Sequence, residues 1–283
     1  MPIYRPALLP VLPLEEFVTV DQTNFPSPEL DNGLGALRVH LELSSFELSA
    51  SYLRGYAPLP GFALASYGVG EEAAVSIART AYAHQVVGFD FSTAFGEVLA
   101  LRGEAAYRRP LSEERQVYEP RPDLQYVLGV DRAFGDVSVI VQYLGRYVFD
   151  WEREQPPEMQ ITPAALAGFT MITDALAEAI PASINQELEV RNQLLFSQLA
   201  RVQHLASARV EWTALHDTLS LSALGLVNFT TEEMLLYPKL AYRLSDAITV
   251  YGGAEIYVGP DGTLFGVIQE PLSAGYAEVR VGF

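Results

Sequence analysis

Four histidines are the residues of this 283-residue chain best suited to acid–base chemistry or metal binding: His40, His84, His204 and His216. None lies in an HExxH pattern or at another close metal-ligand spacing, and no GxSxG motif supplies a serine nucleophile. The chain also has no cysteine. A serine–histidine–aspartate arrangement can still assemble in space from distant residues. The sequence therefore assigns no catalytic, cofactor-binding or metal-binding residue, and we do not expect an enzyme.

Ionisable residues of both signs form a second set, because they alternate with apolar residues along many segments. In an extended strand, side chains two positions apart share a face. Near the C-terminus, for example, Ala277, Val279 and Val281 fall on one face, whereas Glu278 and Arg280 fall on the other. The ionisable residues placed on such polar faces are Arg38, Glu42, Arg102, Glu104, Asp131, Arg146, Arg209, Glu211, Lys239, Arg243, Glu255, Glu278 and Arg280.

Eleven segments with this alternation predict β-strands. They span residues 37–43, 46–52, 87–95, 99–107, 124–134, 137–149, 202–214, 218–229, 236–244, 248–258 and 274–283. Their length is close to the roughly 9–11 residues that a tilted strand needs to cross a membrane. Aromatic residues such as Tyr52, Trp212 and Tyr242 lie on the apolar faces, as in the girdles at membrane interfaces.

The connections between these segments alternate in length. Short turns such as 43–46, 95–98 and 134–137 carry Ser, Gly or Asp, whereas 56–74, 108–123, 150–193 and 258–273 are long. Within 150–193 a helix is predicted from Thr162, as N-cap, to about Ile180, with Pro181 stopping or kinking it. Tight turns at one end and long loops at the other are typical of an outer-membrane barrel.

Composition excludes several classes of protein. The net charge of −17, from 18 basic and 35 acidic residues, argues against nucleic-acid binding. No run of about 20 apolar residues predicts a transmembrane helix. Prolines at positions 2, 6, 10 and 13 interrupt the apolar N-terminus, so we do not expect it to be a signal peptide. Taken literally, the chain would then stay in the cytoplasm; the alternative is that the sequence begins after a removed leader or partway through a longer protein.

The C-terminal segment AGYAEVRVGF, which ends in Phe283, resembles the last strand of bacterial outer-membrane β-barrels of the porin-like kind. This resemblance implies that Phe283 is a signal read by the barrel-assembly machinery, and that the protein lies in the outer membrane of a Gram-negative bacterium. It implies an all-β fold, an antiparallel up-and-down transmembrane barrel with one long, helix-containing extracellular loop. Since single-chain bacterial barrels have even strand numbers, we expect about twelve strands.

Two regions follow from this interpretation. Residues 1–33 form an irregular, proline-rich N-terminal segment or outer loop, and residues 34–283 form the barrel, with a helical insertion at about 151–192.

The function expected from this fold is a porin-like channel for passive or weakly selective passage of small polar solutes. The thirteen ionisable residues would then line water in the lumen, although structural ion-pair ladders explain each of them equally well. Two alternatives stay open: a barrel hydrolase with its site at the outer rim, tested at His40 or His84, and a non-conducting structural or ligand-binding barrel. The expected partners are outer-membrane lipid, the barrel-assembly machinery and small polar solutes, without nucleic acid or a cofactor.

Overall fold

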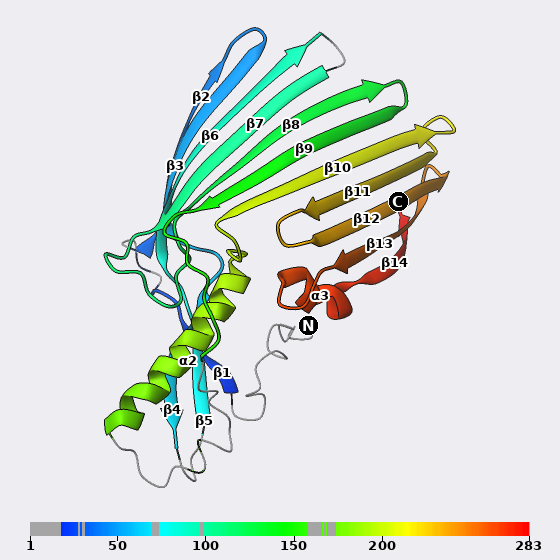
Figure 1. Cartoon of the computed structure of the whole chain (residues 1–283). Helices are drawn as coiled ribbons and strands as arrows, with labels where there is room; N and C mark the ends of the chain where they lie inside the picture. The colour runs from blue at the N-terminus through cyan, green and yellow to red at the C-terminus, as the bar shows by residue number, and fades with distance from the viewer. Residues whose placement is uncertain are drawn as a thin grey trace.

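An antiparallel sheet of eleven strands dominates the computed structural model, which describes residues 18–27, 29, 32–69, 74–96, 99–157, 166, 168 and 174–282 (Figure 1). Its strands follow one another in the order β2-β3-β6-β7-β8-β9-β10-β11-β12-β13-β14. Their bounds are β2 Gly35–Glu42, β3 Phe46–Tyr56, β6 Ala83–Phe95, β7 Leu99–Pro110, β8 Asp123–Phe134, β9 Val137–Val148, β10 Val202–Ala214, β11 Leu219–Asn228, β12 Glu233–Ser245, β13 Ile248–Val258 and β14 Ala274–Val281.

The prediction of an all-β, antiparallel up-and-down fold is confirmed. Each of the eleven predicted segments overlaps one strand of this sheet, and every neighbouring pair in it is antiparallel. The count of eleven is close to the twelve or so expected. β2 and β14 form the two edges of the sheet (Figure 1). Phe283 lies outside the described residues, so its predicted role stays a prediction.

Tight hairpins close one end of this sheet. Gly96 and Gly135 have φ angles of 67° and 58°, a left-handed conformation that glycine adopts without a steric penalty. They lie in the turns β6–β7 and β8–β9, and the turn β10–β11 is short as well. The long connections all leave from the opposite end, which we call the loop end.

The sheet has one apolar and one polar face. Residues directly opposite each other share a face, so the register assigns every strand residue to one of them. The polar face carries Arg102, together with Gly129 and Gln142 on the next two strands. The apolar face carries Val130, Val141 and neighbours in the same register, and most of its large side chains are exposed: Val279, for example, is 64% exposed. No other layer of the described structure covers this apolar face (Figure 1).

A second, three-stranded sheet at the loop end was not predicted. Its order is β1-β5-β4, where β1 (Val18–Asn24) pairs parallel with β5 (Ala74–Thr80), and β5 pairs antiparallel with β4 (Gly61–Gly68). β1 lies within the segment that the sequence indicates to be irregular. The larger of the two clusters of buried apolar side chains lies here rather than in the large sheet, with Val75 and Ile77 almost fully buried.

Helix α2 (Asp174–Leu195) packs on this small sheet through Ile180, Ile184 and Leu188 (Figure 1). The predicted helix ended too early, because α2 continues past Pro181 to Leu195, which is nearly four further helical turns. Proline removes the hydrogen bond to the carbonyl four residues earlier, which is that of Ala177. The Tyr67 hydroxyl of β4 donates to this carbonyl at 3.3 Å, so the carbonyl keeps a hydrogen-bond partner. The predicted N-cap, Thr162, lies outside the described residues.

A second short helix, α3 (Leu264–Leu272), precedes β14 and contacts β13. Thr263 caps it by accepting a hydrogen bond from the Gly266 N–H at 3.1 Å. No helix in the described part of the chain is both long enough and apolar enough to span a membrane.

Candidate functional site

The polar face of the large sheet brings the thirteen sequence-predicted ionisable residues together. In register, Arg102 of β7 lies opposite Ser92 of β6, Arg209 of β10 lies opposite Ile140 of β9, and Glu278 of β14 lies opposite Tyr251 of β13. The same reasoning from strand to strand places all thirteen on this face. Whether the face borders a lumen stays a prediction.

Several of these residues form ion pairs exposed to solvent. Arg102 of β7 pairs with Asp131 of the neighbouring strand β8 at 2.9 Å, and Arg38 of β2 pairs with Asp90 of β6 at 3.0 Å. Two pairs join residues two apart on one strand, Arg209–Glu211 and Glu278–Arg280, each at 2.9 Å. The face therefore combines charges of both signs in short, mixed ladders, with little stabilisation expected from each exposed pair.

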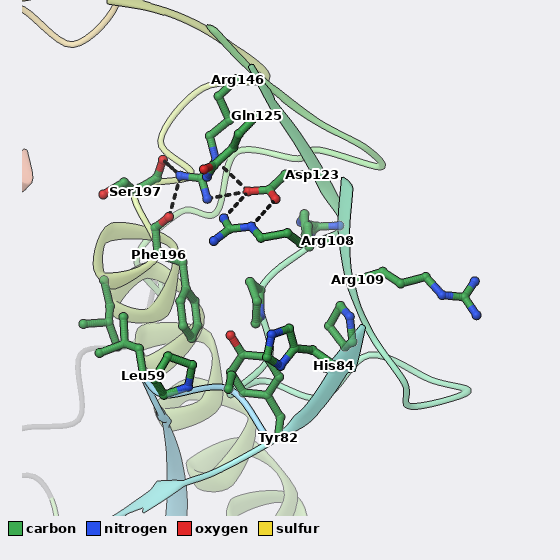
Figure 2. A pocket seen from close by; sticks show the side chains of 16 residues that line it. Leu59, Tyr82, His84, Arg108, Arg109, Asp123, Gln125, Arg146, Phe196 and Ser197 are labelled. Carbon is green, nitrogen blue, oxygen red and sulfur yellow. Dashed lines mark hydrogen bonds and ion pairs between the residues drawn. The ribbon is translucent and has the colours of Figure 1, made fainter. Parts of the chain in front are cut away.

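One ion cluster at the loop end of this face is buried. The Asp123 side chain is 1% exposed and accepts hydrogen bonds from Arg108 Nε at 2.8 Å and Nη2 at 2.7 Å. Arg146 donates to the same carboxylate from Nε at 2.6 Å and also from Nη2 (Figure 2). Since two guanidinium groups share one carboxylate, the cluster carries one net positive charge.

Arg146 also ties the large sheet to α2. Its Nη1 donates to the carbonyl oxygens of Phe196 and Ser197, both at 2.7 Å, directly after the last turn of the helix (Figure 2). A cation at a helix C-terminus satisfies free carbonyls and complements the helix dipole. With its amide oriented to satisfy both arginines, Gln125 accepts from Arg108 Nη2 at 2.6 Å.

A cavity of about 310 Å³ opens beside this cluster, between the loop end of the large sheet and the end of α2. Its wall includes Tyr82, His84, Arg108 and Phe196 (Figure 2). Burial raises the pKa of Tyr82 to about 12, so its hydroxyl stays protonated near neutral pH. The Tyr82 ring packs edge-on against Phe196, with ring centroids 5.9 Å apart.

The four histidines lie at separate places in the fold. His40 is on β2 opposite Ser49, His84 lines the cavity, and His216 is in the turn β10–β11. His204 lies on the apolar face, where its Nδ1 is 2.6 Å from the Tyr143 hydroxyl. Among the described residues no group of three or more acidic or histidine side chains is placed to hold a metal ion.

Sequence reasoning missed the buried cluster for a simple reason. It ended one strand at Tyr107 and began the next at Leu124, so Arg108 and Asp123 fell into a predicted loop. In the structure both are strand residues, paired opposite each other at the ends of β7 and β8. The alternation did contain a signal, because Arg108 continues the series Arg102, Glu104, Ala106.

No family model matches the sequence, and no curated protein matches it. Two solved structures align over 88% of the chain, each at 12% identity and a TM-score of 0.33. One is the outer membrane phospholipase (OMPLA) dimer of Salmonella typhi with bound calcium, of which 77% is covered; the other is outer membrane phospholipase A of Escherichia coli, of which 82% is covered. Likeness at this level transfers no property to the present chain.

Proposed function

We propose that this protein lies in the outer membrane of a Gram-negative bacterium as a β-barrel, with the apolar face of its large sheet against lipid. The observation that carries this proposal is the separation of the two faces. A continuous apolar face over eleven strands is far larger than the few hundred Å² that soluble monomers expose. Strand lengths of 8 to 13 residues suit a span, and the hairpins and loops lie at opposite ends.

A membrane location requires the sheet to close, because unpaired backbone groups in hydrocarbon are costly. We therefore propose that the edges β2 and β14 become paired in the membrane. Closure would turn the polar face inward, so that the thirteen ionisable residues line a water-filled lumen. The expected partners are then lipid, the barrel-assembly machinery that reads the C-terminal strand, and small polar solutes.

Within this fold we propose a channel for small polar solutes, since charges of both signs run along the polar face over its whole width. A barrel hydrolase is the alternative. Its site would need a nucleophile beside a general base. Among the described residues, however, His204 is hydrogen-bonded to Tyr143 rather than to a serine.

Reconstitution into planar bilayers tests the channel, and stepwise conductance is the expected result. Arg243→Glu, on the polar face, is expected to shift the reversal potential towards cation selectivity, because it replaces a positive charge at the passage with a negative one. Arg132→Glu is the matched control: it also lies next to a tight turn, but on the apolar face, and it should leave selectivity unchanged.

Folded protein that never conducts would contradict the channel. The same detergent-solubilised preparation is assayed for hydrolysis of phospholipids and peptides. Activity that disappears with His40→Ala or His84→Ala would instead establish the hydrolase alternative.

A further inference from the structure

The cavity beside Asp123 has an uneven balance of charge. Arg108 and Arg146 face a single carboxylate, that of Asp123. Arg121, a further cation of the wall, is already neutralised by Glu154, with Nη2 and Oε1 2.7 Å apart. Arg109 also borders the cavity, but its side chain extends away from the cluster (Figure 2). One guanidinium charge therefore has no counterion in the wall.

The buried carboxylate of Glu119, in the loop before β8, does not supply this counterion. Glu119 is buried, but it accepts hydrogen bonds from the Ser112 hydroxyl and from the Gln116 N–H within its own loop. It does not line the cavity. The uncompensated charge is thus a property of Arg108, Asp123 and Arg146 themselves.

Donors on the cavity wall are left without acceptors. Arg108 uses Nε and Nη2 for Asp123, whereas its Nη1 has no acceptor in the described structure, and its side chain is 41% exposed. The Tyr82 hydroxyl likewise has no hydrogen bond to a described residue, although Tyr82 is 8% exposed. Nδ1 of His84, on the same wall, is buried and unpartnered within the described part of the chain.

An oxyanion in the cavity would neutralise the uncompensated charge. It would also accept hydrogen bonds from the Arg108 and Tyr82 donors, which otherwise face solvent. A guanidinium group stays charged at every physiological pH and presents a planar edge that matches carboxylate or phosphate oxygens. The protonated Tyr82 hydroxyl is a second donor for the same oxygens. The volume of about 310 Å³ suits a small molecule rather than a chain segment.

We propose that this cavity binds a small oxyanion, a phosphate or carboxylate group, between the free edge of Arg108 and the Tyr82 hydroxyl. The ligand would sit where the polar face of the sheet meets the end of α2, and would add contacts between these two parts. This proposal is independent of the proposed channel function, because it rests only on the positions of the residues around the cavity.

Isothermal titration of the full chain in nonionic detergent micelles tests the site, with inorganic phosphate and acetate as probes. Saturable binding with one site per chain is the expected result for at least one probe. Arg108→Gln should weaken it about tenfold or more, because a charge-assisted hydrogen bond is lost while Asp123 keeps Arg146. Arg102→Gln, on the same strand and the same face but outside the cavity wall, should leave affinity unchanged.

Tyr82→Phe keeps the test valid if Arg108→Gln fails to fold, because it leaves the ion cluster intact. It should weaken binding about threefold to tenfold.

Adding phosphatidic acid to the micelles separates two sources of the anion. Competition with phosphate supports a lipid headgroup as ligand, and its absence supports a free small molecule. No saturable binding of either probe, or equal losses with Arg108→Gln and Arg102→Gln, would overturn the proposal.

Discussion

Asp123→Asn is expected to lower the free energy of unfolding by about 3–5 kcal/mol. The substitution keeps the shape of the side chain but removes the only carboxylate between Arg108 and Arg146. Both guanidinium groups would then lie close together without a counterion, and Arg146 is itself buried. Because Arg146 also holds the carbonyls after α2, the contact between the large sheet and the helix should weaken as well.

Asp131→Asn is the matched control on the same strand. Its partner is Arg102, and both side chains are partly exposed, at 28% and 47% respectively. Exposed ion pairs contribute about 0–1 kcal/mol, so this variant should unfold almost like the parent protein. Urea titration of detergent-solubilised protein, followed by tryptophan fluorescence, measures the free energy of unfolding of both variants. Equal destabilisation by the two variants would contradict a structural role for the buried cluster.

Val141→Arg tests which medium covers the apolar face. Val141 lies near the middle of β9, opposite Val130 and Ala208 of the neighbouring strands. If lipid covers this face, a charge near the centre of the bilayer should cost about 2–4 kcal/mol. If water covered it, the cost would be close to zero, because Val141 is 51% exposed in the described structure.

Ile140→Arg is the control for this substitution. Ile140 is the next residue of the same strand, but it lies on the polar face between Asp131 and Arg209. An added arginine there meets charges of both signs and should change stability by less than about 1 kcal/mol. Reversible unfolding from lipid vesicles measures the free energy of unfolding of both variants. A small effect of Val141→Arg in vesicles would show that lipid does not cover this face.

The eleven strands of the large sheet could be predicted because their signal is local. Alternation along a strand with one apolar and one polar face is visible within one segment, as in Ala274–Val281. It also put every candidate residue on the correct face, since a side chain's face follows from its position alone. Pairing order followed as well, because in an up-and-down antiparallel sheet successive strands are neighbours whether the connection between them is short or long.

The small sheet could not be predicted in this way. β4 has apolar residues on both faces, as in Phe62-Ala63-Leu64, so its alternation is weak. β1 and β5 are parallel partners separated by about 50 residues of sequence, a pairing for which no local pattern exists. The carbonyl of Ala177, which Pro181 leaves without a helical partner, accepts from the Tyr67 hydroxyl, more than 100 residues away in the chain.

The candidate cavity escaped prediction for a related reason. Its residues come from the connections after β3, before β6 and before β8, from the start of β6 and of β8, from the ends of β7 and β9, and from the end of α2. Strand ends are where periodicity is least informative, and one residue of error there moved Arg108 and Asp123 into a loop. The convergence of Arg108 and Arg146 on Asp123 depends on register between three strands, which sequence alone does not provide.

Fluorescence quenching by brominated phospholipids tests the central claim most directly, namely that the apolar face lies against lipid. Trp212 is on that face, near the turn β10–β11, whereas Trp151, the other tryptophan, donates to the Gln198 carbonyl beside α2. In vesicles, a Trp151→Phe variant that keeps only Trp212 should be strongly quenched, most by bromines near the headgroup end of the acyl chains. Trp212→Phe, which keeps Trp151, should be quenched far less. Emission from Trp212 that is unaffected by bromines at any depth would contradict the claim.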